Sequence, residues 1–172
     1  MPDWRNFRHY EWSFKKLVSS LWGVCYRGEN NTVADFSWPV RVYYEDTDHG
    51  GVVYYANYLK FMERARTEWL RARGVEQDRL IEQQGVIFAV RSAQLDFLKP
   101  GRFNQQLGVS AQVVETGKAS LTFEQAVTLQ PGEEESGEVL CRGQIKIACL
   151  DANSMKPRAI PISIRQEILG DG

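Results

Sequence analysis

The residues best suited to chemistry lie together in residues 46–51, whose sequence is DTDHGG. An ionised aspartate can attack a carbonyl carbon directly or take a proton from an attacking water, so Asp48 offers a nucleophile or a general base. Aspartates in such loops also commonly shape turns or cap helices, and this structural role is the alternative for Asp46 and Asp48. Gly50 and Gly51 permit a positive φ or a close approach of the backbone. We therefore expect a turn that presents one carboxylate.

The stretch after this loop predicts one long helix. Apolar residues recur at spacings of three and four between residues 58 and 72, and Gly74 stands where a C-terminal cap belongs. Asn57 is of the type expected at the N-cap, with positioning of the substrate or of Asp48 as a second role. The first N–H groups of a helix have no intrahelical acceptor and lie at its positive end. A helix that begins near Tyr55 to Tyr58 can therefore stabilise negative charge that develops on a carbonyl oxygen.

The remaining pattern predicts antiparallel strands. Apolar and polar residues alternate from residue 40 to residue 45, which indicates a half-buried strand. Residues 76–84 follow the long helix as a loop or as a short helix. Four further strands are expected after them, at residues 85–97, 107–113, 121–127 and 139–149. They are separated by Pro100 and Gly101, by a turn at 116–118 and by the polar loop 130–137. The fold class is therefore α+β.

A single helix cannot cover both faces of a five-stranded antiparallel sheet. We expect a sheet edge or the uncovered face to meet another subunit, because exposed strand edges tend to pair. An isolated α+β monomer with one solvated sheet face fits the alternating pattern nearly as well and is the alternative.

The composition excludes several classes of protein. The chain has 172 residues, 43% of them hydrophobic and 25% charged, which fits one soluble core. No run of about 18 apolar residues could span a bilayer, and a net charge of -1 provides no basic surface for nucleic acid. Cys141 and Cys149, roughly 26 Å apart in one extended strand, cannot pair within a chain, and Cys25 is the third cysteine. Without a secretion signal or a Cys/His cluster, we expect a cytoplasmic protein with no metal and no cofactor.

Residues 1–36 differ in character from the domain that we expect over residues 37–172. They carry scattered aromatic residues and include the polar run RGENNT at residues 27–32. Residues 12–22 show an amphipathic pattern that suits a helix on a membrane or on a partner subunit, and a membrane contact would place the protein at the periphery of the inner membrane. The alternative is a disordered leader, or a start codon assigned upstream of a native start near Val33.

One long run carries a resemblance to a known family. Residues 43–70, YYEDTDHGGVVYYANYLKFMERARTEWL, resemble the family that includes 4-hydroxybenzoyl-CoA thioesterase and, more closely, the small acyl-CoA thioesterases associated with the Tol-Pal system of Gram-negative bacteria. The similarity continues at residues 88–91 and 155–161 and spans about residues 37–168. It implies the hotdog fold, in which a five-stranded antiparallel sheet wraps around the long helix. It also implies homodimers or homotetramers with active sites at the dimer interface.

The resemblance assigns roles to residues of the loop and of the helix start. It implies that Asp48 is the catalytic carboxylate and that the backbone N–H of Tyr55 binds the thioester carbonyl oxygen, while Asp46 is structural. The chain departs from the Tol-Pal group at His49, where that group usually has alanine, and at Tyr55, where it usually has histidine. The second change is mild, because 4-hydroxybenzoyl-CoA thioesterase also carries tyrosine there. His49 is either an ordinary surface residue or a replacement for the missing histidine.

Further residues are expected to contact the substrate. Gly51 and Asn57 lie beside the catalytic pair in the sequence. Coenzyme A carries three phosphates, so cationic residues are expected near the mouth of the site. The candidates, taken from strand ends and the tail, are Arg91, Lys99, Lys156 and Arg158.

These assignments predict an acyl-CoA thioesterase that releases coenzyme A and a short-chain or aromatic acid, with the nucleophile and general-base roles of Asp48 both open. A hotdog hydratase or dehydratase would need a histidine paired with a carboxylate, and the sequence offers only His9, in the leader, and His49. Another alternative is a non-catalytic subunit that binds acyl-CoA or acyl carrier protein in envelope lipid metabolism. Thiol release from a panel of acyl-CoAs separates the enzyme from the binding subunit.

Overall fold

The computed structural model describes residues 36–130 and 137–169 of the chain. These residues belong to one compact unit that extends from Asp35 to Gly172. The predicted leader, with its amphipathic stretch, lies outside the described residues apart from Phe36, as do His9, Cys25 and the centre of the predicted polar loop. The extension over residues 1–36 therefore stays a prediction.

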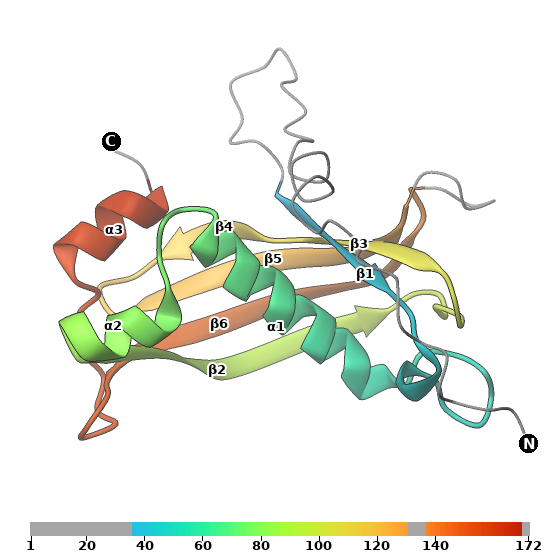
Figure 1. Cartoon of the computed structure of the whole chain (residues 1–172), viewed down its shortest axis with the longest axis horizontal. Coiled ribbons are helices and arrows are strands. Elements are labelled where there is room, and N and C mark those ends of the chain that lie inside the picture. Colours follow the sequence, from blue (N-terminus) through green and yellow to red (C-terminus); the bar gives the residue numbers. More distant parts are fainter. Residues whose placement is uncertain (1–35, 131–136, 170–172) are drawn as a thin grey trace, which may run out of the picture. The chain divides into compact units, whose positions relative to one another are not determined.

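The described residues form six strands and three α-helices (Figure 1). The strands are β1 (Ser37–Arg41), β2 (Val86–Phe97), β3 (Gln106–Ser110), β4 (Gln112–Thr116), β5 (Ser120–Leu129) and β6 (Val139–Asp151), and the helices are α1 (Tyr55–Arg71), α2 (Gln77–Gln84) and α3 (Ile162–Leu169). The strands pair antiparallel in the order β1-β3-β5-β6-β2, with β4 also paired to β5. Helix α1 lies across one face of this sheet, and α2 and α3 lie toward the end of the sheet away from the start of α1 (Figure 1).

The core forms between α1 and the sheet. Phe61, Met62 and Ala65 are completely buried on the inner face of the helix, as the spacing of three and four predicts. Trp69 meets Phe123 of β5 edge to face, with ring centroids 5.1 Å apart. Burial of each large apolar side chain stabilises the fold by about 1.5–3 kcal/mol. The predicted helix is confirmed and begins earlier than its apolar pattern, at Tyr55.

The sheet has six strands because the strand expected at residues 107–113 is interrupted at Ala111. Both halves pair with β5, and the register is kept across the interruption, with Val109 opposite Val127 and Gln112 opposite Glu124. At the interruption, the hydroxyl of Ser110 accepts a hydrogen bond from the N–H of Ala126 at 2.8 Å. The N–H of Ala111 turns instead to the carbonyl of Phe36, at 3.1 Å. The expectation of five strands is thus corrected to six.

Two other expectations need adjustment. The first strand was expected to continue to residue 45, but β1 ends at Arg41, and the 3-10 turn η2 (Tyr44–Asp46) follows. Tyr44 is therefore 82% exposed rather than part of the buried face. The connection over residues 76–84 is largely helical, as α2, and the tail contains the unexpected helix α3. Cys141 and Cys149 are both free and buried on β6.

Strand β2 lies at one edge of the sheet, paired only with β6 among the described strands. It is 12 residues long, whereas β1 at the other edge has only five. The pairing register with β6 shifts between Val90 and Ser92, so Arg91 is the extra residue of a β-bulge. Residues 90–94 are all exposed. The sheet therefore presents one long, accessible edge.

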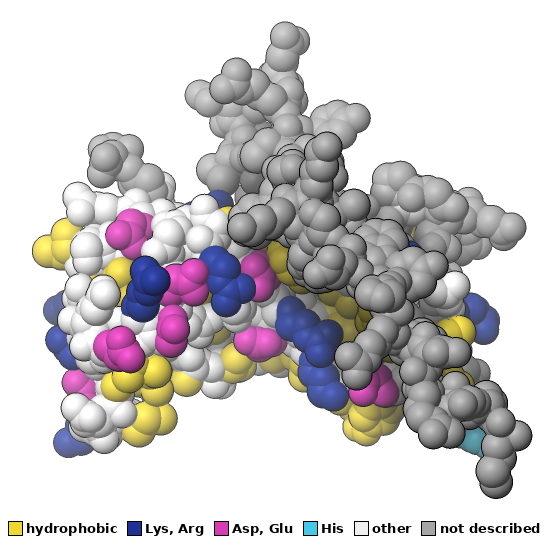
Figure 2. Space-filling model, viewed as in Figure 1, with side chains coloured by type: hydrophobic (Ala, Val, Ile, Leu, Met, Phe, Trp, Pro, Cys, Tyr) yellow, Lys and Arg dark blue, Asp and Glu magenta, His cyan; other side chains and the backbone are white. Residues whose placement is uncertain are grey.

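The solvent face of α1 is charged. Lys60, Glu63 and Arg64 are exposed, and Figure 2 shows Lys and Arg side chains interspersed with Asp and Glu side chains on this side of the molecule. The mixture is typical of a helix whose opposite face is buried. Within the described part of the chain, none of the helices is both long enough and apolar enough to cross a membrane.

Candidate active site

Asp48 lies at the turn of a short hairpin that leads into α1. Thr47 and Val53 form an antiparallel bridge, and the N–H of Asp48 donates to the carbonyl of Val52 at 2.9 Å. The N–H of Gly51 closes the turn with a hydrogen bond of 3.0 Å to the carbonyl of Asp48. Gly51 has a φ of +73°, a conformation that other residues adopt only with strain. The turn expected from the glycine pair is therefore present.

The carboxylate of Asp48 is oriented by the same turn. Its Oδ1 accepts a hydrogen bond from the N–H of Gly50 at 2.8 Å. A Cβ atom at Gly50 would lie 3.1 Å from this oxygen, so glycine allows the close approach. Among the described residues, nothing donates a hydrogen bond to Oδ2, and the side chain is exposed in the isolated chain. One carboxylate oxygen is thus held and the other is free to react.

Asp46 and Asn57 hold the loop to the helix. Asp46 is buried, and its Oδ2 accepts the N–H of Tyr43 at 2.9 Å. The carbonyl of Asp46 accepts both the N–H of Tyr54 and the side-chain amide of Asn57, each at 2.9 Å. Asn57 is not the N-cap that its residue type suggested, because the helix begins two residues before it and Tyr54 is the N-cap.

The start of α1 is suited to binding an oxyanion. Tyr55 is the first residue of the helix, so its N–H has no carbonyl one turn earlier in the helix to pair with. Within the described chain, the side chain of the N-cap residue Tyr54 makes no capping hydrogen bond. The positive end of the helix therefore offers its first amides to a negatively charged atom.

A hollow of about 270 Å³ opens beside this helix start. Its floor includes Tyr58, which is buried and whose hydroxyl accepts the N–H of Gly101 at 2.9 Å. Burial raises the pKa of the Tyr58 hydroxyl, so it stays protonated. The residues that line the hollow are mostly apolar or aromatic: Val53, Tyr55, Tyr58, Phe97, Leu98, Lys99 and Pro100.

The four predicted cationic residues do not gather at this site within one chain. Arg158 lies beside the first residue of β2, where it donates to the carbonyl of Gly85 and pairs with Asp151, both at 3.2 Å. Lys156 is exposed in the same loop. The other end of β2 reaches the hollow, and the 12 residues of the strand span roughly 36 Å. Lys156 and Arg158 therefore lie far from the Asp48 loop of their own chain.

The other two candidates lie closer. Arg91 is exposed at the bulge of β2, with no ion-pair partner among the described residues. Lys99 lines the hollow, but its ammonium group is paired with Glu138. The structure keeps Asp48, Gly51, Tyr55 and Asn57 in one hairpin and helix start, as their closeness in the sequence suggests. The end of β2, distant in the sequence, lies beside this helix start. Sequence reasoning missed Phe97 and Tyr58 as site residues, and the only signal for that region was the strand stop at Pro100 and Gly101.

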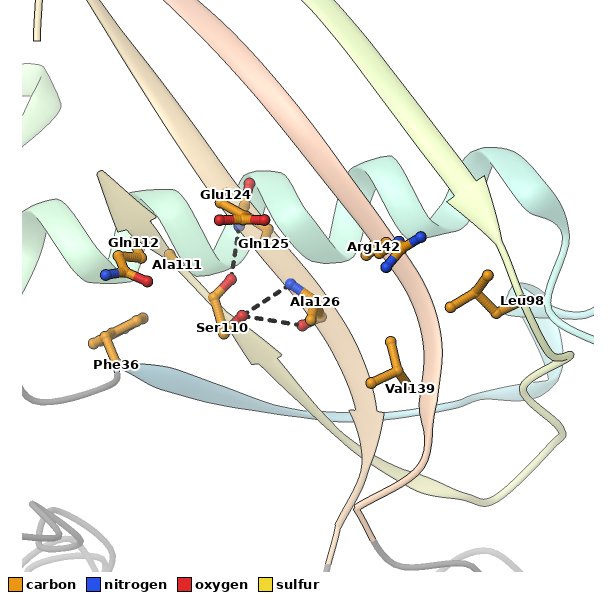
Figure 3. A pocket seen from close by; sticks show the side chains of 10 residues that line it. All are labelled: Phe36, Leu98, Ser110, Ala111, Gln112, Glu124, Gln125, Ala126, Val139 and Arg142. Carbon is orange, nitrogen blue, oxygen red and sulfur yellow. Dashed lines mark hydrogen bonds between the residues drawn. The ribbon is translucent and has the colours of Figure 1, made fainter. Parts of the chain in front are cut away.

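A second hollow, of about 400 Å³, lies on the other face of the sheet. Figure 3 shows most of its lining side chains in front of the strands, with α1 behind, whereas the side chain of Gln125 reaches toward α1 and donates to the carbonyl of Met62. Ser110 and Ala126, at the interruption between β3 and β4, form part of its wall, and Glu124 and Arg142 are its charged residues. None of the predicted site residues lines it, so it does not belong to the candidate active site.

An antiparallel sheet packed on one long helix, with a carboxylate loop leading into the helix start, defines the hotdog class of α+β enzymes. The comparison with protein families identifies the class more closely, because residues 50–136 match the family model described as the thioesterase superfamily. The chain belongs to the thioesterase superfamily. It is 42% identical to the acyl-CoA thioesterase YbgC of Haemophilus influenzae over 130 residues. This aligned region covers 76% of this chain and 91% of that relative.

Solved structures agree with this assignment. A probable thioesterase from Bartonella henselae superimposes with a TM-score of 0.67 at 30% sequence identity, covering 74% of this chain and 100% of that one. A 4-hydroxybenzoyl-CoA thioesterase mutant, solved with 4-hydroxybenzoyl-CoA, has a TM-score of 0.71. Its identity of 16%, over 79% of this chain and 99% of the other, shows the fold alone. The predicted hotdog fold and the predicted family are confirmed.

Proposed function

We propose that this chain hydrolyses the thioester bond of an acyl-CoA to a free acid and coenzyme A, with Asp48 and the N–H of Tyr55 as its reacting groups. The observation that carries this proposal is the hairpin itself: one arm presents the free Oδ2 of Asp48, and the other arm runs directly into the uncapped start of α1. The names of the curated relatives, acyl-CoA thioesterase and acyl-CoA thioester hydrolase, support the same activity.

The chemistry follows from these two groups. The carbonyl oxygen of the thioester accepts the N–H of Tyr55, which stabilises the negative charge that builds on this oxygen during attack. As a nucleophile, Asp48 forms a mixed anhydride and expels the thiolate of coenzyme A, and water then cleaves the anhydride to regenerate the carboxylate. As a general base, Asp48 takes the proton of an attacking water, and the collapse of the oxyanion expels the thiolate. Gly51 shapes the loop, and Asn57 holds it against the helix.

A homodimer completes the site. Two copies of β2, paired antiparallel about a two-fold axis near Arg91, would satisfy the long open edge of each sheet. This pairing brings the start of one β2 beside the end of the other. Lys156 of the partner subunit and Arg158 of the partner subunit then lie at the mouth of the site, where the phosphates of coenzyme A need cations. Sedimentation distinguishes this dimer from a monomer or a tetramer.

The test of the reaction is thiol release from a panel of acyl-CoAs, with acyl-carrier-protein thioesters as a second substrate form. Asp48→Asn keeps the size of the side chain and is expected to lower kcat by about a hundredfold or more, while the fold and binding persist. Glu45→Gln, at an exposed carboxylate of the same segment, is the matched control and should behave as wild type. An active Asp48→Asn variant would overturn the role of Asp48. Wild-type protein that binds acyl-CoA without releasing thiol would favour the non-catalytic binding subunit.

A further inference from the structure

The hollow beside the start of α1 has fixed walls on the side of residues 98–101. The N–H groups of Leu98 and Lys99 both donate to the carbonyl of Leu140, at 2.9 and 3.0 Å. The ammonium group of Lys99 is paired with Glu138, so it is not available to an acyl group inside the hollow. This wall cannot move aside for a larger substrate without loss of these two hydrogen bonds and the ion pair.

Gly101 joins this wall to the start of α1. Its N–H donates to the hydroxyl of Tyr58 at 2.9 Å, and its carbonyl accepts the N–H of Val53 at 2.8 Å. A Cβ at Gly101 would lie only 3.0 Å from a methyl group of Val53 and 3.3 Å from the Tyr58 hydroxyl, so the backbone approaches as closely as glycine permits. The oxygen of the Tyr58 hydroxyl is thus engaged by the backbone of this wall.

Phe97 is the aromatic residue that stands between this wall and the helix start. It ends β2, and its ring contacts Tyr58 and Tyr55 edge to face, with centroids 5.7 and 6.4 Å away. Tyr58 is only 3% exposed, whereas Phe97 is 52% exposed. A change of size at Phe97 therefore alters the hollow without disturbing the core.

We infer that Phe97 closes the acyl end of the site and restricts the substrate to compact, apolar acyl groups. This inference rests on the proposed function, because the hollow adjoins the N–H of Tyr55 that binds the thioester carbonyl. In the isolated chain the hollow has a volume of about 270 Å³ and is open to solvent. A short chain or a single ring fits within these walls, whereas an extended fatty acyl chain meets the ring of Phe97.

The test compares kcat/KM for straight-chain acyl-CoAs from butyryl to palmitoyl in Phe97 variants. Phe97→Ala is expected to raise the ratio of long-chain to short-chain kcat/KM by about tenfold, the effect of roughly 1.4 kcal/mol in differential binding. Phe97→Trp should lower the same ratio. Phe103→Ala is the matched control, because Phe103 is 56% exposed, contacts Tyr44 and does not line the hollow.

The outcomes separate this inference from the proposed function. Wild-type protein that releases no thiol from any acyl-CoA would contradict the function itself. Hydrolysis by the wild type with an unchanged chain-length ratio in Phe97→Ala and Phe97→Trp would contradict only the role of Phe97. Circular dichroism and sedimentation check the fold and assembly of each variant, and Phe97→Leu replaces Phe97→Ala if the larger truncation does not fold. A shift in the Phe103→Ala control equal to that of Phe97→Ala would also overturn the inference.

Discussion

The side-chain amide of Asn57 donates a hydrogen bond of 2.9 Å to the main-chain carbonyl of Asp46, two residues before the catalytic candidate Asp48. This carbonyl also accepts the N–H of Tyr54, the N-cap of α1. Asn57 is 4% exposed, so its bond to the loop is shielded from water. The first turn of the helix and the loop are therefore held in one arrangement, which a reaction between carboxylate and helix-bound carbonyl requires.

Loss of this bond should slow the reaction more than it weakens binding. Asn57→Asp keeps the shape of the side chain but removes the donated hydrogen, and we expect kcat to fall about tenfold or more with KM changed less than about threefold. Steady-state kinetics measures both values, and Asn153→Ala, at an exposed position at the far end of the sheet, serves as control. Equal loss of kcat in the control, or a change in KM alone, would argue against positioning.

His49 is expected to be dispensable. Its side chain is exposed on the loop, and no hydrogen bond or ion pair of it is recorded in the described chain. His49→Ala should keep kcat/KM within about threefold of wild type, and a loss of tenfold or more, about 1.4 kcal/mol, would make it a catalytic residue. Steady-state thiol release from an acyl-CoA gives kcat/KM for both proteins.

A buried polar pair links α1 to the sheet. Arg66 and Gln125 are 7% and 1% exposed, and the guanidinium donates to the Gln125 side chain at 2.7 Å. The amide of Gln125 in turn donates to the carbonyls of Met62 and Ser110, each at 3.1 Å. Burial lowers the pKa of the Arg66 guanidinium, and the nearby charge of Glu63 acts in the opposite direction.

The two side chains should therefore be coupled in their effect on stability. Gln125→Leu is expected to lower the free energy of unfolding by about 3 kcal/mol, because it leaves the buried Arg66 guanidinium and two buried carbonyls without these hydrogen bonds. The double variant with Arg66→Met should lose less than the sum of the two single changes. Urea unfolding of all four proteins gives the coupling, and additive losses would show that the pair contributes nothing beyond its separate side chains.

Cys141 should react slowly with thiol reagents below alkaline pH. Burial, with the charge of Asp96 adding to it, raises the pKa of this thiol from 9.0 to about 11. Because only the thiolate reacts, alkylation of Cys141 in the folded protein should keep rising as the pH passes 9.0. The neutral thiol is favoured by folding, so its contribution to stability is complete below pH 9.0 and is lost as the pH rises to about 11. Mass spectrometry of the peptide measures the rate, and a plateau near pH 9.0 would contradict the shift.

The sequence predicted the parts of the fold that local pattern determines. The period of α1, the glycine pair after Asp48 and the alternation of β6 each depend on neighbours in the chain, and all three are present. The contact of Asp48 with the N–H of Gly50 is also local, so the presentation of the carboxylate could be anticipated from the loop.

The rest depends on residues that meet only in the folded chain. The alternation of apolar and polar residues continues through Ser110 and Ala111, so the sequence gives no sign that the strand is interrupted there. The interruption depends on hydrogen bonds to two groups distant in sequence, the side chain of Gln125 and the carbonyl of Phe36. Asn57 was expected at the N-cap by residue type, but its partner is the carbonyl of Asp46 in the preceding turn. The ring contacts of Phe97 have no local signal, since its neighbours Tyr55 and Tyr58 lie in another element.

The candidate catalytic loop and the segment that carries Phe97 occupy separate stretches of the chain. The loop and the helix start lie within residues 46–58, whereas the wall lies within residues 97–101 at the end of β2. Mutations in a lineage can therefore alter the second stretch and inherit the first unchanged. Such an arrangement allows relatives to differ in substrate preference while they share one reaction. Exchange of a few residues at the end of β2 is then a practical route to a redesigned enzyme.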